Sequence, residues 1–178
     1  MRSVIFRVLL VLGALVGVVL AIGLGLPRDH TATSRITLER PPDSVWVVVR
    51  DLGALVDTWS EIRSARRLPS EEGKEVWEQD FNGVPMRLVV VSADPPHRLV
   101  TRVDAREDAA FGGTWTYSLA PEGRASTTVT VTEVGFVRNP FFRVLMGLMG
   151  VHRTTDSYLR ALADKFGEAA RPEHVRTN

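Results

Sequence analysis

The chain changes its hydrophobic periodicity abruptly at Asn139-Pro140, inside the segment from Gly112 to Glu168. Before this point, Trp115 and Tyr117 alternate with threonine and serine, and the alternation returns after a turn at Pro121-Glu122-Gly123. A period of two predicts two half-buried strands that form a hairpin. Beyond it, apolar residues recur at about 100° per residue, which predicts one long amphipathic helix. Its apolar face would hold Phe141, Leu145, Leu148, His152, Thr155, Leu159, Leu162 and Phe166, and its opposite face Arg143, Arg160, Asp164 and Lys165.

The apolar face of that hairpin and the apolar stripe of that helix each need a surface to bury against. Packing them against each other satisfies both at once. We therefore expect an α+β domain in which an antiparallel sheet covers a C-terminal helix. Any ligand site is expected to lie between the two.

The residues before the hairpin predict a strand, two short helices and a meander of further strands. Thr31 to Leu38 alternates like a strand. Asp43 or Ser44 can cap the helix that follows, and Ala54 to Trp59 predicts a second short helix. Turn residues separate the next strands, and Asn82-Gly83 is the sharpest hairpin signal among them. These strands are expected at Ile62–Leu68, Lys74–Phe81, Met86–Ala93 and Arg98–Asp104.

The N-terminus carries a long apolar run. Val4 to Leu26 spans 23 residues, of which Arg7 is the only charged one. As a helix it would be about 34 Å long at 1.5 Å per residue, which is enough to cross a hydrocarbon core of about 30 Å. The apolar stretch of a cleaved signal peptide is usually only about 7 to 15 residues long. The length therefore favours a retained anchor in residues 1–27, which contacts the membrane through residues 4–26, over a cleaved signal peptide.

Two further features of this run bear on its arrangement in the membrane. Basic residues flank it on both sides, so they give only a slight preference, for a domain on the outer side. Gly13, Gly17, Ala21 and Gly25 recur every four residues and would form one ridge of small side chains. Such a ridge can pair two helices as a homodimer. Glycine is also common in membrane helices generally, so both interpretations stay open.

Charge and composition exclude several classes of protein. Arg2 and Arg7 account for two of the 22 basic residues, which leaves 20 basic against 21 acidic residues in the rest of the chain. This balance gives no indication of nucleic-acid binding, which needs a basic face. The chain has no cysteine, and therefore no disulfide, thiolate nucleophile or cysteine-based zinc site. The histidines are not spaced as metal ligands and no nucleotide-binding or serine-nucleophile motif is present, so we expect neither metal nor cofactor.

A series of short motifs runs in a fixed order through residues 31–168. They are Pro41-Pro42-x-x-Val45-Trp46, Trp59, Gly112-Gly113-Thr114-Trp115-Thr116-Tyr117, the strand Thr127–Glu133, and Asp156-x-Tyr158-Leu159-x-x-Leu162 followed by Phe166-Gly167-Glu168. Their order and spacing resemble the SRPBCC (START-like) superfamily, and more narrowly its polyketide cyclase/dehydrase and lipid-transport branch. The resemblance implies a helix-grip fold, in which a curved antiparallel sheet wraps around a long C-terminal helix with a hydrophobic cavity between them. Here one transmembrane helix would precede that domain, and residues 169–178 would form a flexible tail.

Two polar residues fall on faces that should line the space between sheet and helix. His152 lies on the apolar stripe, and Glu133 follows Val129 and Val131 at a period of two. An imidazole and a carboxylate facing one cavity could orient a ligand or act as an acid–base pair. A structural role is the more ordinary one, because an unpaired buried polar group costs about 1 to 3 kcal/mol and such groups normally find partners. The side chains expected to contact a ligand, or else to form plain core, are Trp59, Trp77, Phe81, Met86, Leu88, Phe111, Trp115, Tyr117, Leu145, Leu148, Met149, His152 and Thr155.

The superfamily includes lipid carriers, small-molecule binders, aromatic cyclases and hydrolases, so its fold does not fix the function. We expect a membrane-tethered domain that binds a hydrophobic small molecule or lipid in an internal cavity, because such a ligand partitions out of water. One alternative is a cyclase- or hydrolase-type enzyme with His152 and Glu133 as its acid–base candidates. Another is a non-catalytic interaction module that fills its cavity with its own side chains.

Overall fold

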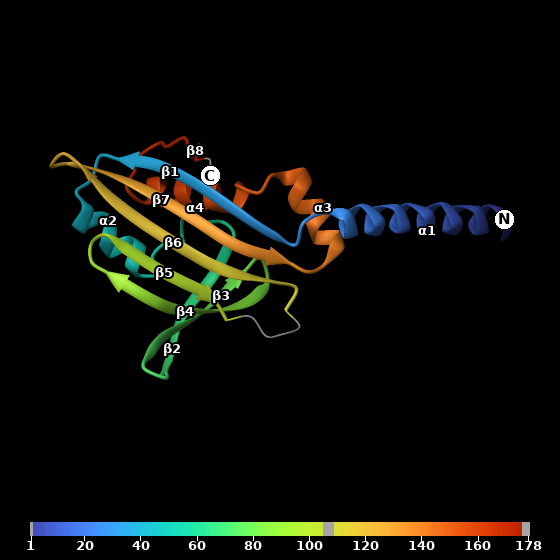
Figure 1. Ribbon diagram of the computed structural model, residues 1–178, viewed down its shortest axis with the longest axis horizontal. Helices are drawn as coiled ribbons and strands as arrows, with labels where there is room; N and C mark the ends of the chain where they lie inside the picture. The colour runs from blue at the N-terminus through green and yellow to red at the C-terminus, as the bar shows by residue number, and fades with distance from the viewer. Residues whose placement is uncertain (1, 105–108, 176–178) are drawn as a thin grey trace.

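The computed structural model describes residues 2–104 and 109–175, with side chains from residue 5 onward. Within these residues, eight antiparallel strands form one sheet in the order β2-β3-β4-β5-β6-β7-β1-β8. Figure 1 shows α4 lying beside this curved sheet, α2 towards one end of the molecule, and α1 projecting from the other end next to α3. The strands are β1 (Asp29–Leu38), β2 (Ile62–Glu71), β3 (Lys74–Phe81), β4 (Val84–Asp94), β5 (Arg98–Val103), β6 (Phe111–Glu122), β7 (Ser126–Val137) and β8 (Glu173–His174). The helices are α1 (Arg2–Gly25), α2 (Pro42–Arg50), α3 (Pro140–Met149) and α4 (Arg153–Lys165).

The strand meander follows the predicted turn chemistry. Between β3 and β4, Asn82 and Gly83 both have positive φ, 52° and 87°. A two-residue type I′ turn needs this conformation, which an Asn-Gly pair adopts readily. The predicted hairpin of β6 and β7 is also present, and it places Trp115 opposite Glu133 and Tyr117 opposite Val131.

The predicted single C-terminal helix is wrong, because the structure has two helices there. Asn139 caps α3 by accepting a hydrogen bond from the Phe141 amide at 2.9 Å. Gly150 has φ of 87°, and its amide donates to the Met146 carbonyl at 2.9 Å. A glycine with positive φ ends a helix in this way. The helical periodicity of the apolar residues continues across Gly150, so this pattern alone predicts a single helix.

The predicted apolar stripe is therefore correct in α4 but wrong in α3. On α4, Thr155, Leu159 and Leu162 have no solvent exposure. On α3, Leu148 is 80% exposed, whereas Arg143, predicted on the solvent face, is only 3% exposed. The break at Gly150 gives α3 a different direction from α4. A single helical projection therefore cannot predict which side of α3 is buried.

Two local predictions near α2 are also wrong. Ala54 to Trp59 forms successive turns instead of a helix, with bonds such as Ala54 N–H to the Asp51 carbonyl at 2.9 Å. The helix α2 begins at Pro42 without a side-chain cap, so neither Asp43 nor Ser44 caps it. Proline at the first helical position needs no hydrogen-bond partner for its nitrogen, which removes one reason for a cap.

The tail expected at residues 169–178 is partly ordered. Glu173 and His174 form β8, which pairs with Arg35 and Ser34 of β1. The Val175 amide continues this ladder by donating to the Thr33 carbonyl at 2.9 Å. Residues 176–178 of the expected tail and Met1 of the expected anchor lie outside the described residues.

The core lies between the sheet and α4. Leu159 and Leu162 of α4 are fully buried, as are Leu38 of β1 and Val129 and Val131 of β7. Because α4 contacts β1 and β7, these side chains close one side of the sheet's inner face. The other part of that face, from β3 to β6, is left for the site described below.

An ion pair fixes the end of α2 to β3, and it gives a testable pH dependence. Both carboxylate oxygens of Glu75 accept from the Arg50 guanidinium, and one also accepts from the Trp77 indole at 2.7 Å. Arg50, followed by the Trp77 bond, lowers the pKa of Glu75 to about 2. A lowered folded-state pKa means stability that is complete above the unfolded-state pKa of 4.5 and is lost as the pH falls towards 2.

We therefore expect Glu75→Gln to reduce the loss of stability between about pH 4.5 and pH 2. Urea unfolding of the variant and the unchanged chain across this range measures the effect. Glu72→Gln, a change of the same kind at an exposed turn, is the control and should leave the pH profile as it is. Equal profiles for Glu75→Gln and the unchanged chain would contradict the role of this ion pair.

Candidate functional site

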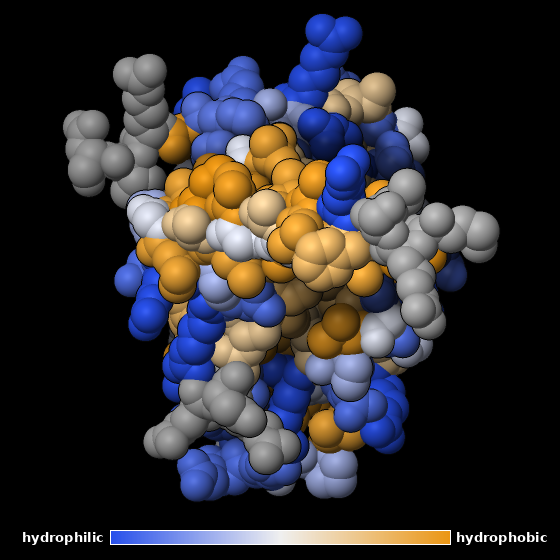
Figure 2. Space-filling view, turned by 90° about the vertical axis from the view of Figure 1, so that its right-hand side faces the viewer, coloured by the Kyte–Doolittle hydropathy of each residue, from blue (hydrophilic) through white to orange (hydrophobic). Residues whose placement is uncertain are grey.

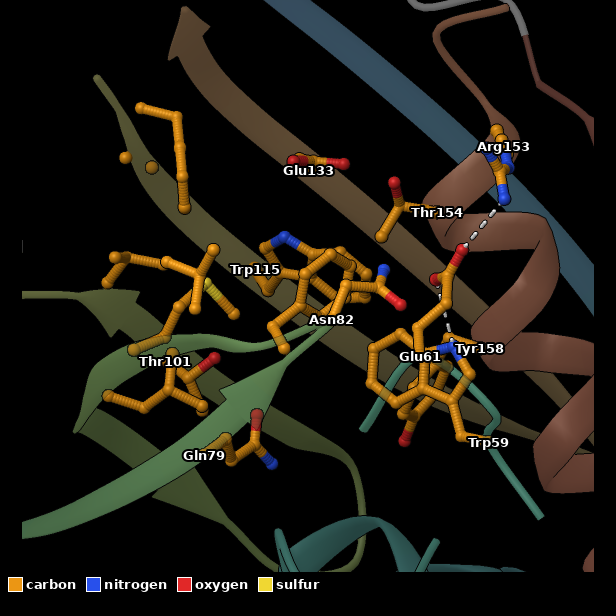
Figure 3. A pocket seen from close by; sticks show the side chains of 18 of the residues that line it. Trp59, Glu61, Gln79, Asn82, Thr101, Trp115, Glu133, Arg153, Thr154 and Tyr158 are labelled. Carbon is orange, nitrogen blue, oxygen red and sulfur yellow. Dashed lines mark hydrogen bonds and ion pairs between the residues drawn. The ribbon is translucent and has the colours of Figure 1, made fainter. Parts of the chain in front are cut away.

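A cavity of about 500 Å³ lies between the inner face of the sheet and helices α2, α3 and α4. This volume falls within the roughly 300–1,000 Å³ of sites for small organic ligands. Most of the wall is aliphatic or aromatic, and Figure 3 shows the polar side chains set among these residues. The polar or ionisable residues on the wall are His30, Asp51, Glu61, Gln79, Asn82, Thr101, Tyr117, Glu133, Arg153, Thr154 and Tyr158.

An aromatic cluster built around Tyr158 of α4 forms one part of this wall. Its ring centroid lies 5.3 Å from that of Trp59, 5.9 Å from Trp115 and 5.2 Å from Tyr117. Phe81 extends the cluster by an edge-to-face contact with Trp59 at 5.9 Å. Edge-to-face and tilted pairs of this kind are the favourable geometries for aromatic rings. The cluster joins β3, β6 and α4 through one rigid apolar surface.

The two tyrosines of this cluster stay neutral. Burial raises the pKa of Tyr158 well above its ordinary value, and the neighbouring Tyr117 adds to the effect. Burial also raises the pKa of Tyr117, against a hydrogen bond from Thr101 that acts in the opposite direction. A neutral phenol can both donate and accept a hydrogen bond. These hydroxyl groups can therefore meet a polar atom of a bound molecule without adding charge to the cavity.

Glu61 is a buried carboxylate held by several donors. It is 8% exposed, and its Oε2 accepts from the Trp59 indole at 3.2 Å and from the Ser157 hydroxyl at 3.1 Å. Its Oε1 lies 3.4 Å from the Arg153 guanidinium, and Figure 3 shows this pair at the start of α4. These donors compensate for the loss of water around the charge.

A second pair joins the start of β1 to β7. His30 Nε2 lies 3.6 Å from Glu133 Oε1, and the two side chains are 11% and 19% exposed. Gly135, which is opposite His30 in the register, makes this contact possible. A Cβ atom at Gly135 would lie 2.9 Å from the His30 ring, which is closer than side chains can pack. His30 Nδ1 is buried and has no hydrogen-bond partner among the described residues.

The structure places most of the predicted ligand-contact residues on the cavity wall. Those on the wall are Trp59, Phe81, Met86, Leu88, Phe111, Trp115, Tyr117, Leu145 and Met149. Glu133 lies there too. The predicted residues that are not on the wall are Trp77, Leu148, His152 and Thr155.

His152 and Glu133, predicted to face one cavity, lie in different surroundings. His152 Nδ1 is 3.4 Å from the Ser34 hydroxyl, and its ring stacks on that of His174 at 3.9 Å. Burial lowers the pKa of His152, and the nearby His174 adds to this effect. Glu133 pairs with His30 instead. The break before α4 turns His152 away from the cavity, so the geometry does not form the predicted acid–base pair.

Thr155 belongs to the same hydrogen-bonded cluster as His152, between α4 and β1. Ser34 donates to Asp156 Oδ1 at 2.7 Å and lies 3.0 Å from the Thr155 hydroxyl. Asp156 Oδ2 is 2.9 Å from His174 Nε2 on β8. Ser34 and Thr155 have no solvent exposure, so their hydroxyl groups join α4 to the sheet and are not open to a ligand.

Several wall residues were not predicted, above all His30, Glu61 and Arg153. His30 follows the apolar N-terminal run, and Glu61 comes before a strand, so neither lies in a periodic pattern. One signal was available: Gly135 lies within β7, two residues after Glu133. A glycine within a strand often marks a close approach by another group, here the ring of His30.

The donor set of this cavity is poor in metal ligands. Within residues 2–104 and 109–175, no group of three or more histidine, aspartate or glutamate side chains is arranged to hold a metal ion. Two of the carboxylates on the wall are paired separately, Glu61 with Arg153 and Glu133 with His30. The wall offers hydrogen-bonding groups, aromatic surfaces and one imidazole–carboxylate pair, His30 with Glu133.

The family assignment follows from a match over most of the chain. The sequence model of the family described as polyketide cyclase/dehydrase and lipid transport matches residues 29–170, which include β1 to β7, α2, α3 and α4. The chain belongs to this family. The polyketide cyclase/dehydrase and lipid transport family lies within the SRPBCC (START) superfamily, so the α+β helix-grip fold is confirmed. No curated protein matches the sequence.

Solved structures share this fold with the family member described here. A conserved protein from Geobacillus kaustophilus superposes with a TM-score of 0.60 at 16% identity, covering 82% of this chain and 100% of its own. The Zhui aromatase/cyclase from Streptomyces sp. R1128 gives 0.61 at 18% identity, covering 78% and 94%. A START superfamily protein from Mycobacterium smegmatis gives 0.58 at 17% identity, covering 78% and 97%. At these identities the similarity establishes the fold and leaves the ligand open.

Proposed function

We propose that this chain is a membrane-tethered protein that binds a hydrophobic small molecule or single-chain lipid in the cavity between the sheet and the C-terminal helices. The observation that carries the proposal is the cavity itself, with a volume of about 500 Å³ and a lining of mainly apolar and aromatic side chains. The family supports binding of a hydrophobic ligand or cyclase activity. An unfilled cavity of this size argues against the alternative of an interaction module whose own side chains fill its interior.

The polar residues of the wall favour a ligand with few polar groups. Glu61 is satisfied by Trp59, Ser157 and Arg153. Glu133 is paired with His30. When a ligand covers Glu61 and Glu133, both carboxylates keep their partners in the protein. The ligand therefore does not have to form hydrogen bonds with them. The volume fits a fused-ring system or a single acyl chain better than a two-chain phospholipid.

The N-terminal helix supports the tethering part of the proposal. Ile5–Gly25 is 21 residues long and mostly exposed, and its length and composition suit a membrane span. At 1.5 Å per residue it extends about 31 Å, close to the thickness of a hydrocarbon core. A signal sequence shares these properties. The proposed arrangement is a retained membrane anchor in α1, with the domain on the outer side of the membrane.

The small-residue ridge of α1 stays a prediction. A Cβ atom added at Gly13, Gly17 or Gly25 would meet nothing within 4 Å. This face of α1 is therefore open to a second helix or to lipid. A homodimer through this ridge and contact with lipid alone are both compatible with this open face.

The ligand proposal is tested by native mass spectrometry on the full chain purified from its host in mild detergent. We expect a bound hydrophobic compound that organic solvent removes. Added back to the stripped protein, the same compound should change the emission of Trp59 and Trp115, which lie on the wall. A variant with Trp46→Phe and Trp77→Phe isolates these two, since the other two tryptophans lie off the wall. The proposal would be contradicted if the purified protein carried no compound and the solvent-extracted protein bound none.

A second candidate function, a cyclase-type enzyme, is supported by one observation. His30 and Glu133 place an imidazole 3.6 Å from a carboxylate on the cavity wall, where such a pair can exchange a proton with a ligand. The same mass measurement separates the two functions. A binding protein releases its compound chemically unchanged, whereas an enzyme converts the compound added back to a product of different mass or ring structure.

A further inference from the structure

The outward surface of α3 is apolar and exposed. Phe141 is 52% exposed, Phe142 46%, Leu148 80% and Met149 45%. The only charged residue of α3 is Arg143, and it is buried. A soluble monomer rarely leaves such a continuous apolar surface in water. Figure 2 views the molecule from the N-terminal end of α1 and shows apolar side chains gathered in a band on the side from which α1 projects, with hydrophilic groups above and below.

The start of α3 packs directly against the end of α1. A Cβ atom at Gly23 would lie 2.1 Å from the Pro140 carbonyl oxygen, so only glycine allows the two helices to approach this closely. Gly23 itself is buried, unlike its neighbours on α1. The contact belongs to the last turn of α1 and the first turn of α3.

Hydrogen bonds hold the connection between α1 and the domain in one position. The buried Arg143 guanidinium donates to the Leu26 carbonyl and to the Arg138 carbonyl, both at 2.9 Å. The Val137 amide donates to the Arg28 carbonyl at 2.8 Å. Because β1 begins at the next residue, the chain has no free linker between α1 and the sheet.

These contacts set the depth of α3 relative to a membrane that α1 crosses. Gly23 lies two residues inside the end of the candidate span Ile5–Gly25, which is about 3 Å along the helix axis. In a membrane that α1 crosses, Pro140 would therefore lie at the boundary between head groups and acyl chains. Amphipathic helices bury their aromatic and aliphatic side chains about 5 to 10 Å deep at this boundary.

The same helix also borders the cavity. Phe142, Leu145, Met146 and Met149 of α3 line its wall. The helix thus presents apolar side chains to the cavity on one side and to the surroundings of α1 on the other. An apolar molecule passing between them would stay in contact with apolar groups.

We propose that α3 lies in the bilayer surface and forms a portal, made of Phe142, Leu145, Met146 and Met149, through which a single-chain lipid passes from the membrane into the cavity. This inference rests on the proposed function, since it needs both the anchor and the ligand cavity. The bilayer, rather than another protein, covers α3, because its exposed surface continues directly from α1 and carries no charge that a protein partner could pair with.

The depth of α3 is measured on the full chain in phosphatidylcholine vesicles. The sequence has no cysteine, so Leu148→Cys can be labelled at one site with bimane. We expect nitroxide-labelled lipids to quench most of its fluorescence. Val47→Cys is the matched control, because Val47 is also an exposed apolar helix residue, 69% exposed, but lies on α2 at the far end of the molecule in Figure 1. Its label should not be quenched.

Carbonate extraction of the same vesicles separates failure of the portal from failure of the anchor. If the chain resists extraction and the label at position 148 is as accessible to water as the label at 47, the portal is wrong and the anchor stands. If carbonate removes the chain, α1 does not span the membrane and both are overturned. Ligand binding in detergent is read independently in either case.

Passage of lipid is measured with a fatty acid that carries a photoreactive diazirine, incorporated in the same vesicles. We expect crosslinks on α1, on α3 and on residues deep in the cavity such as Trp115 and Tyr158. Val91, exposed on β4 outside the cavity, should carry none. Crosslinks confined to α1 and α3 would overturn the portal, because they would show contact with the membrane without passage into the cavity.

Discussion

Met86→Asp is expected to weaken binding of the co-purified hydrophobic ligand by at least about 100-fold, which corresponds to about 2.7 kcal/mol. Met86 lies on β4 and lines the cavity while keeping partial exposure, so an aspartate there can remain hydrated when the cavity is empty. A bound apolar ligand would displace that water from an unpaired carboxylate. Removing water from an unpaired charge costs several kcal/mol. Titration of the stripped protein with the ligand, followed by tryptophan emission, measures the loss.

The control is Val91→Asp, the same type of change on the same strand but at an exposed position outside the cavity. It should bind the ligand as the unchanged chain does. Circular dichroism confirms that both variants keep the fold. If Met86→Asp and Val91→Asp bind equally well, the ligand occupies another part of the protein, and the cavity is not its site.

Leu159→Ala is expected to lower the free energy of unfolding by about 2 to 5 kcal/mol, which is the usual cost of removing a fully buried leucine side chain. Leu159 has no solvent exposure and packs in the core between α4 and the sheet. The truncation leaves a void that the surrounding strands cannot close completely. Urea unfolding of the full chain in detergent, with the shift of the midpoint and an unchanged slope, measures the effect.

Leu148→Ala is the matched control for this change and also tests the break between α3 and α4. In one continuous helix, residues 148 and 159 would differ by about 20° at 100° per residue, and both would be buried. The structure instead leaves Leu148 80% exposed. We expect Leu148→Ala to change stability by less than about 0.5 kcal/mol. A loss as large as that of Leu159→Ala would contradict the two-helix structure.

The strands and the overall order of elements could be predicted because each depends on neighbouring residues. The alternation around Trp115 and Val129 and the Asn82-Gly83 turn describe their own conformations. The break at Gly150 could not be found in the same way, since glycine is tolerated inside helices and the periodic pattern continues on both sides of it. Whether such a glycine ends a helix depends on what the next segment packs against, and here α3 packs against α1.

The candidate site likewise contains residues that a local pattern predicts and residues that only the folded structure brings together. Glu133 was predicted because its place in the strand follows from Val129 and Val131. Its partner His30 lies about a hundred residues away in the sequence, and only the pairing of β1 with β7 brings them together. Glu61 depends similarly on Ser157 and Arg153, which the fold supplies from α4. Patterns within a segment indicate which face a residue occupies, whereas contacts between segments decide which residues meet.

The close contact of Gly23 with Pro140 also limits how far this protein can reach. Only Leu26, Pro27 and Arg28 separate α1 from β1, and three residues span at most about 11 Å even when extended. A protein that shuttles between two membranes needs a long, compliant tether. With its anchor in place, this domain would instead stay at a fixed height above a single membrane. Its ligand would then be exchanged with that membrane, or with a partner that comes to it.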